Sequence, residues 1–363
     1  MSAKDHKHGD KEKERAEPKK KHSSHKSSAN ASMAGKITRV EYKTPFVFKG
    51  EERTEKNYIY RLSTKADCYQ FRCFADSLDG FHLRHEELND VMVWDKSLSG
   101  EPMHVIKVFG LFVRTPEDPN GGCTPKEMWD LLQDAVFRIQ WDAFRAEAFE
   151  IVRLDQTNDI GYYAAKSPMS IVANRDFVNQ RMWHDTGRGE YVIFNTSVPH
   201  DDVPPTYMKD NKKNKDGSYV RAFSKLTGYL IQPYTDARTG EVTGTALTYI
   251  TQSDPCGWIP TSVTNYISTK FAPNTIKNVR GALQKFRTWL PEQMANGTYE
   301  KGWDLPQPSD WDEGDSVSNE TMSFAKAKWL HEMEKEEKKK KRRTTSKVGG
   351  DKRNNIIIIK TRK

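Results

Sequence analysis

The sequence lacks any uncharged run that reaches the roughly 18 residues of a membrane-spanning helix. Its N-terminus is rich in Lys and His and has no apolar segment of the kind that directs secretion. Only four cysteines occur among 363 residues, and none of them forms a CxxC pair or stands beside a histidine cluster. These absences argue against a membrane-spanning or disulfide-rich secreted protein and predict a cytoplasmic protein with reduced thiols and no metal site.

Positive charge is concentrated at the two ends of the chain. Residues 1–36 contain ten Lys/Arg against five Asp/Glu, and residues 335–363 contain thirteen against three. Because the whole chain carries only +8, the middle carries about −7. A mildly acidic middle argues against nucleic acid as the partner of the folded part.

The composition of the two ends predicts little folded structure in either of them. We expect a disordered basic tail over 1–50, because that segment has few apolar residues to bury. Over 291–363 we expect an acidic linker, a short amphipathic helix and a basic tail. The six consecutive cations from Lys338 to Arg343 suit a solvated tail, an anionic lipid surface or a nuclear-import signal.

The first half of the middle region predicts two helices separated by strands. Apolar residues at helical spacing begin at Cys68, and the segment ends at Asp79-Gly80. The strand-like segments VMVWDKS and MHVIKVFGLFV (103–113) follow. A second helix begins with Thr124 as N-cap and a proline at its first position, and its apolar spacing continues as far as Asp142.

From 147 to 254 the pattern changes to alternation with β-branched and aromatic residues, which predicts six strands joined as antiparallel hairpins. The polar segment 200–218 is expected to be a protruding loop. A long amphipathic helix over 259–286, kinked at Pro273, comes last. The predicted fold class is α+β, with a curved antiparallel sheet of about nine strands covered by the late helix.

Catalytic motifs are absent from the sequence. There is no GxSxG, and the histidines of the central region occur in predicted loops or at strand ends without the spacing of a nucleophile and base, namely His82, His85, His104, His184 and His200. We therefore predict that the protein is not an enzyme and requires no cofactor.

Five segments, taken in their order along the chain, resemble a known family: FRIQWD, IGYYAAKSP, NRDFV, RAFSKLTGYLIQP and TYITQSDPCGWIP. Together they are similar to START lipid-transfer domains, and among these to the phosphatidylcholine-transfer group, over residues 58–290. The resemblance implies a helix-grip fold, in which the sheet wraps the C-terminal helix around a hydrophobic tunnel that holds one lipid. It also implies a non-enzymatic carrier, and we expect a monomer.

Arg138 and Asp142 stand at i and i+4, so they share one face of a helix. An arginine fork suits a phosphate and a carboxylate suits a cationic headgroup, although the two could equally form a simple intrahelical ion pair. The resemblance implies that they bind the headgroup of a phospholipid. It also places an aromatic cage for choline at Tyr163, Phe177 and a third position near Lys225. Because Lys225 is not aromatic, both phosphatidylcholine and phosphatidylethanolamine are possible ligands.

The resemblance assigns a tunnel lid to the segment that contains Met169, Ile171 and Val172, whose apolar side chains would touch a membrane surface while the tunnel is open. Pro273 would weaken the last helix and help it to act as a gate. The alternative to a lid is an ordinary buried loop, and the alternative to a gate is a helix that only closes the core.

The predicted function is therefore carriage of one phospholipid between membranes, with peripheral membrane association. The alternative functions are a sterol or ceramide carrier of the same fold, in which polar residues deeper in the tunnel would bind the ligand. The remaining alternative is an acyl-thioester hydrolase, because related helix-grip cavities are found attached to such activities.

Overall fold

The computed structural model describes residues 37–87, 91–101, 103–115, 118–167, 172–205, 207, 219–235, 241–257 and 272–299. In this part of the chain the main element is a ten-stranded sheet with the order β4-β5-β6-β13-β12-β10-β9-β8-β7, and β11 pairs with β9. Its strands are β4 (His82–Glu87), β5 (Val91–Lys96), β6 (Val105–Val113), β7 (Arg145–Arg153), β8 (Asn158–Ala165), β9 (Asn174–Asp185), β10 (Tyr191–Ser197), β11 (Tyr219–Arg221), β12 (Phe223–Thr235) and β13 (Val242–Asp254).

Neighbouring strands of this sheet are antiparallel, apart from the short parallel pairing of β11 with β9. Strands β7 to β10 follow one another as hairpins, and β12 and β13 form a long hairpin that joins β10 to β6. The strands predicted over 147–254 are therefore confirmed, and so is their antiparallel order. The sheet includes one strand more than the predicted nine or so because the short β11 is separate from β12.

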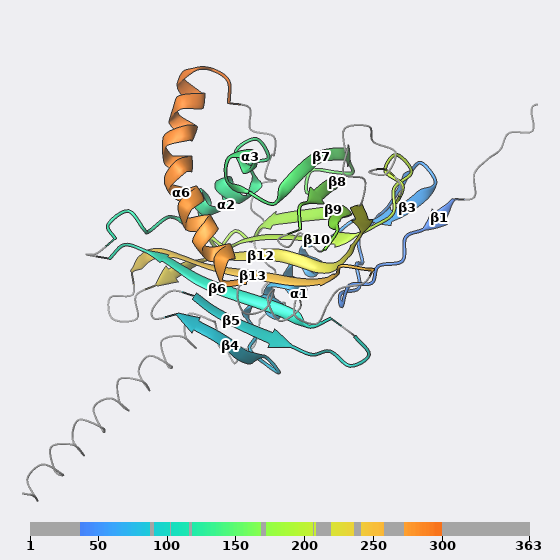
Figure 1. Ribbon diagram of the computed structural model, residues 1–363, viewed down its shortest axis with the longest axis horizontal. Coiled ribbons are helices and arrows are strands. Elements are labelled where there is room, and N and C mark those ends of the chain that lie inside the picture. Colours follow the sequence, from blue (N-terminus) through green and yellow to red (C-terminus); the bar gives the residue numbers. More distant parts are fainter. Residues whose placement is uncertain are drawn as a thin grey trace, which may run out of the picture. The chain divides into compact units, whose positions relative to one another are not determined.

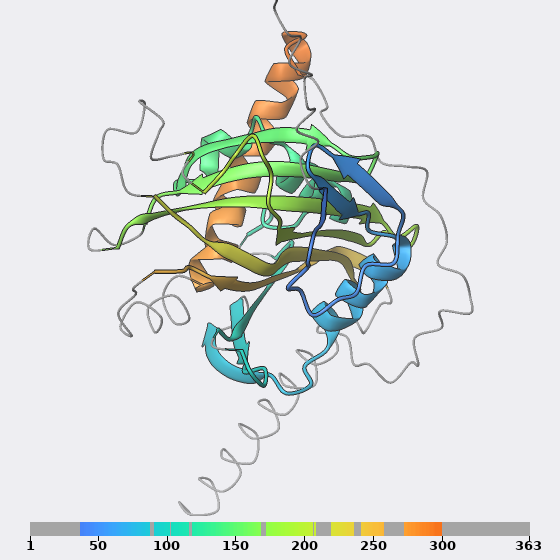
Figure 2. The ribbon, with the colours of Figure 1, turned by 90° about the vertical axis from the view of Figure 1, so that its right-hand side faces the viewer.

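Helices cover the two faces of the sheet differently (Figures 1 and 2). On one face lie α2 (Pro125–Gln133), α3 (Arg138–Trp141) and the long α6 (Ala272–Ala295), and on the other lies α1 (Lys65–Asp76). We call these the α6 face and the α1 face. None of the described helices is long and apolar enough to cross a membrane.

Alternation along the strands supplies each face with its own core. On β12, Ile231 packs with α6 residues such as Leu283, whereas Leu226 and Leu230 pack with Phe71 of α1. Helix α6 approaches the sheet closely at Gly110, where an added Cβ would lie 2.5 Å from Ile276. A side chain at this position would push the helix away from β6.

The helix predicted to run from Pro125 to Asp142 is instead divided into α2 and α3, so that prediction was wrong. The division occurs at Asp134, whose backbone leaves the helical region and whose carboxylate accepts a hydrogen bond from the amide of Phe137 at 2.7 Å. An aspartate that binds a nearby amide begins a new turn rather than continuing the old helix.

Residues 37–50, which the sequence placed in the disordered tail, are packed against the fold. Strand β1 (Thr38–Arg39) joins β3 (Tyr58–Arg61) and β2 (Glu52–Glu55) in a separate three-stranded sheet. After β1, Phe46 and Phe48 are buried in the core of the α1 face. The burial of these two rings offsets the ordering entropy that a polar tail could not offset.

Helix α6 continues to Ala295, beyond the predicted helix end at 286 and the predicted domain end at 290. Pro273 is buried in the first described turn of α6. The earlier part of this predicted helix, 259–271, lies outside the described residues. So does most of the predicted loop 200–218.

Candidate functional site

An ion pair on α3 is the centre of the candidate site. The Nε of Arg138 donates to the Oδ2 of Asp142 at 3.1 Å, and the Asp142 amide donates to the Arg138 carbonyl at 3.0 Å. One turn of helix therefore fixes both side chains at the i, i+4 spacing that the sequence predicted. The Arg138 guanidinium also lies 5.2 Å from the ring centre of Trp141, within reach of cation–π attraction.

Two aromatic residues to which the resemblance assigns the choline cage, Tyr163 and Phe177, lie on the sheet beside this pair. The hydroxyl of Tyr163 on β8 donates to the Oδ2 of Asp142 at 3.0 Å. Phe177 on β9 is the direct cross-strand partner of Tyr163, so the two side chains project from the same face of the sheet. The fold thus places Arg138, Asp142, Tyr163 and Phe177 on the α6 face, although they come from three elements.

Tyr229 and Tyr249 also belong to the candidate site, and the sequence analysis did not identify them. Their rings lie 5.0 Å apart on β12 and β13, and Tyr229 is close enough to Arg138 to affect its ionisation. Lys225, where the resemblance placed the third cage position, instead pairs with Glu101. Spacing along β12 could not reveal Tyr229, because the pairing register shifts between Ser224 and Leu226 and interrupts the alternation at Lys225.

The electrostatics of the pair show a charged site in the interior. Burial lowers the pKa of Arg138, but the combined effect of Tyr229, Asp142 and Tyr163 is larger and raises the pKa above its ordinary value. The guanidinium therefore stays charged. Burial and the negative charge of Asp142 raise the pKa of Tyr163, so its phenol stays protonated. Arg138 is half-buried, with 30% of its side-chain surface accessible, whereas 10% of the Asp142 side-chain surface is accessible.

A row of polar side chains crosses the α6 face beside this site. Thr251, Thr227, Asn195, Arg181 and Asp159 are successive cross-strand partners on five adjacent strands. Asp159 accepts two hydrogen bonds from Arg181, at 2.6 and 2.5 Å, and burial raises the pKa of Asp159 despite this partner. Among the described residues, the Oδ1 of Asn195 is buried without a hydrogen-bond partner. We call these five residues the polar row.

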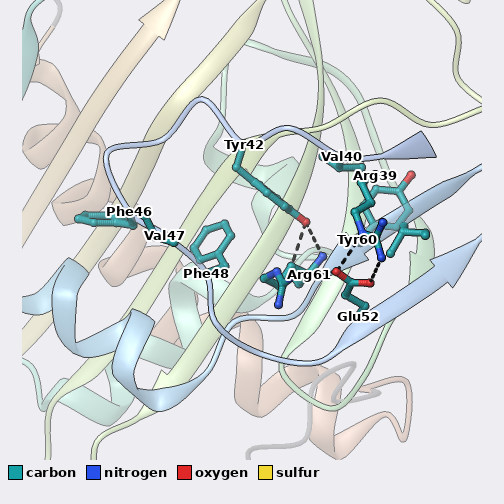
Figure 3. A pocket seen from close by; sticks show the side chains of 10 residues that line it. Arg39, Val40, Tyr42, Phe46, Val47, Phe48, Glu52, Tyr60 and Arg61 are labelled. Carbon is teal, nitrogen blue, oxygen red and sulfur yellow. Dashed lines mark hydrogen bonds and ion pairs between the residues drawn. The ribbon is translucent and has the colours of Figure 1, made fainter.

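The proposed lid is only partly described. Val172 is half-buried just before β9, and Pro273 is buried in α6, whereas Met169 and Ile171 lie outside the described residues. Two cavities occur away from the ion pair. One, of about 230 Å³, has Tyr42, Phe48 and Arg61 among the residues that line it (Figure 3), and the other, of about 440 Å³, lies beside the start of α1. Neither borders α3, so neither belongs to the candidate site.

The described residues include no group of three His, Cys, Asp or Glu side chains arranged to hold a metal ion. The polar groups of the site are instead one guanidinium, one carboxylate and several phenols. This set can bind a ligand that carries both a phosphate and a cationic group.

Comparisons with known proteins agree with this fold. Residues 121–288 match the START domain. START domain-containing protein 10 of Homo sapiens is 35% identical over 244 residues, which make up 67% of this chain and 74% of that protein. The phosphatidylcholine transfer protein of Mus musculus is 24% identical over 188 residues, 51% of this chain and 75% of that protein.

Among solved structures, the crystal structure of human STARD10 is similar with a TM-score of 0.53 and 27% sequence identity, over 71% of this chain and 97% of that chain. These matches define an α+β protein with a large antiparallel sheet and a C-terminal helix. The chain belongs to the START domain family. The resemblance that the sequence motifs indicated is therefore confirmed.

Proposed function

We propose that this protein carries one glycerophospholipid, phosphatidylcholine or phosphatidylethanolamine, in an internal tunnel between membranes. The observation that supports this function best is the Arg138–Asp142 pair on the α6 face, where Tyr163 donates to Asp142 and 30% of the Arg138 side-chain surface is accessible. Membership of a family that includes a phosphatidylcholine transfer protein supports the same function.

A carrier meets a clear physical need for such a ligand. Exposing two acyl chains of about 16 carbons to water costs on the order of 25 kcal/mol at ~0.8 kcal/mol per CH₂ group. A protein that moves the lipid must enclose those chains and pair the charges of the headgroup, because unpaired charge in a low dielectric is costly.

The headgroup chemistry follows from the residues of the site. Arg138 offers its guanidinium to the phosphate, and Asp142, oriented by Tyr163, offers a carboxylate to the ammonium group. Phe177 and Tyr229 supply aromatic faces for the cation. Tyr229 would serve as the cage residue that Lys225 does not provide.

Around this site we propose that Met169, Ile171 and Val172 form the lid that touches the membrane, and that Pro273 helps α6 to act as a gate. The protein would then be a cytoplasmic monomer with transient peripheral membrane contact, and the basic C-terminal tail would add attraction to anionic lipids. In this mechanism lipid is bound and released unchanged, without catalysis or a cofactor.

The decisive experiment is native mass spectrometry of the protein purified from cells, together with lipid transfer between vesicles. Wild-type protein should retain one phospholipid. Arg138→Gln should weaken phosphatidylcholine binding roughly 10- to 100-fold, because it removes a charge-assisted contact with the phosphate. Lys126→Gln is the matched control, since Lys126 forms a partly exposed i, i+4 pair with Asp130 on α2. Intact transfer by Arg138→Gln would exclude the proposed headgroup site.

The polar row favours a second candidate, a sterol or ceramide carrier. Hydroxyl and amide groups of such ligands could bind Asn195 or the Arg181–Asp159 pair, and no phosphate would be needed. The two candidates predict opposite results: a sterol or ceramide carrier would keep its ligand in Arg138→Gln and lose it in Asn195→Val.

A further inference from the structure

A cavity of about 230 Å³ lies in the N-terminal part of the fold, outside the candidate lipid site. Its lining comes from β1, β2, β3 and the segment that connects β1 to β2. Figure 3 shows the side chains of Phe46, Val47 and Phe48 on one side and the Arg39–Glu52 pair on the other. The cavity is therefore apolar at one end and charged at the other.

Two buried rings hold the apolar end in place. Phe46 and Phe48 are 8% and 5% exposed and belong to the core of the α1 face. The ring of Phe48 also packs edge to face on Tyr42, with ring centres 4.9 Å apart. Val47 stands between the two buried rings and is 69% exposed. Because both of its neighbours are fixed, the Val47 side chain stays at the surface beside the cavity, where it can contact an apolar ligand.

The charged end holds one carboxylate between two arginines. Glu52 accepts hydrogen bonds from Nε and Nη2 of Arg39, each at 3.2 Å, and from Nη2 of Arg61 at 2.7 Å. The charged side chains that line the cavity therefore carry one positive charge in excess. In the described part of the chain, Nη1 of Arg39 and Nε of Arg61 form no hydrogen bond, so both guanidiniums have donors for a second anion.

Tyr42 lies between the two ends of the cavity (Figure 3) and fixes their spacing. Its hydroxyl accepts a hydrogen bond from the Arg61 amide at 2.8 Å and donates to the side chain of Gln180 at 2.7 Å. Burial raises the pKa of Tyr42 to about 12. The phenol is therefore neutral at pH 7 and does not cancel the excess positive charge.

We propose that this cavity binds a short aliphatic chain that ends in a carboxylate. The chain packs against Val47 and Phe48, and the carboxylate pairs with Arg39 and Arg61. The volume suits such a ligand, because an apolar cavity of about 150 Å³ already holds a benzene molecule. None of the lining residues belongs to the candidate lipid site, so this inference does not depend on the proposed carrier function.

The test is a titration of the full chain with hexanoate, followed by NMR of the backbone amides. The amides of Val40, Val47 and Ile59 should shift together. Hexanoate should bind about 15-fold more tightly than butanoate, because each buried methylene contributes about fourfold. Hexanol, which has the chain without the charge, should bind about three- to tenfold more weakly than hexanoate.

Two variants assign the binding to this cavity. Arg39→Gln should weaken hexanoate binding about three- to tenfold, and Val47→Asn should weaken it about fourfold. Both side chains are largely exposed, so both variants should fold as the wild type does. Arg84→Gln is the matched control, because Arg84 forms a partly exposed ion pair with Asp95 in the other sheet. This variant should leave the affinity unchanged.

Equal affinities for hexanoate and butanoate, unchanged binding in Arg39→Gln, or shifts confined to other amides would overturn the inference. The peptide N-acetyl-leucyl-glutamate amide carries the same chemistry and distinguishes two sources of the ligand. Tighter binding of the peptide than of hexanoate would identify a protein segment, and weaker binding would identify a free acid. If wild-type protein carries no phospholipid, the proposed function fails, and these titrations still decide the present inference.

Discussion

The two faces of the same sheet are packed in different ways. On the α1 face, the rings of Phe71 and Phe194 are stacked with centres 5.1 Å apart, and neither ring is exposed. Their approach depends on Gly228, where an added Cβ would lie 2.7 Å from Phe71 and 2.6 Å from Phe194. On the α6 face near Arg138, by contrast, the phenols of Tyr229 and Tyr249 are only half-buried.

Because of this difference, residues of one strand can contribute to the stability of the fold on one face and to ligand binding on the other. Along β12, Leu226 and Leu230 are fully buried on the α1 face, while Thr227 and Tyr229 between them keep accessible surface on the other face. Successive side chains of a strand point to opposite faces of the sheet, so one face can be packed for stability while the other keeps surface for a ligand. Leu226 and Leu230 therefore belong to a packed core on the α1 face, whereas Thr227 and Tyr229 leave accessible surface on the α6 face, where the ligand would bind.

The largest expected effect comes from truncating one aromatic residue on each face. Phe71→Ala should lower the free energy of unfolding by about 3–5 kcal/mol, because it leaves a cavity in a packed core. Tyr249→Ala should cost roughly 1–2 kcal/mol, because a half-buried ring has fewer contacts to lose. Urea denaturation followed by circular dichroism measures both values.

Lipid binding provides the opposite ranking for these two variants. Under conditions where Phe71→Ala is folded, it should bind phosphatidylcholine as the wild type does, whereas Tyr249→Ala should bind it more weakly. Equal losses of stability in the two variants would show that the α6 face is packed as tightly as the α1 face, and the comparison would fail.

Lys107 offers a second way to examine the α1 face, because it is an ionisable group buried on that side. It is completely buried and donates to the carbonyls of Phe74 and Ser77 near the end of α1. Burial lowers the pKa of Lys107 from its ordinary 10.5 to about 6. Between these two values the unfolded chain binds a proton that the folded chain does not bind, so stability should rise with pH.

Lys107→Met should remove this part of the pH dependence. The slope of stability between pH 7 and 9 should become smaller by up to about 1.4 kcal/mol per pH unit, which is the limit for one proton. Denaturation midpoints of the two proteins at several pH values provide the measurement. Parallel slopes would mean that Lys107 remains charged in the folded protein.

The parts of the fold that could be predicted are those whose sequence signal lies within one short segment of the chain. The strands over 147–254 were found because alternation and turn residues occur within each segment. The break at Asp134 was missed because apolar spacing continues across it, while the decisive bond is made by one side chain to the amide of Phe137. The order of residues 37–50 was missed because Phe46 packs on Phe194, far along the chain.

The candidate site divides in the same way. Arg138 and Asp142 could be predicted because both belong to one helical turn. Tyr229 could not be assigned from spacing alone, because its proximity to Arg138 depends on how β12 is placed against α3. The polar row likewise exists only through the register of five strands, which no single segment of sequence determines.

The smallest expected effect uses two adjacent tyrosines on β8 that point to opposite faces. Tyr163 donates to Asp142 on the α6 face, and Tyr162 donates to Asp176 at 3.3 Å in a buried cluster on the other. Tyr163→Phe should weaken phosphatidylcholine binding by about three- to tenfold, the value of one hydrogen bond, with little change in stability. Because the pKa of Tyr163 is raised, its phenol stays protonated and the effect should be the same from pH 6 to 8.

Tyr162→Phe should instead lower the free energy of unfolding by about 1 kcal/mol and leave phosphatidylcholine binding unchanged. A loss of binding in both variants would show that the two faces are not independent.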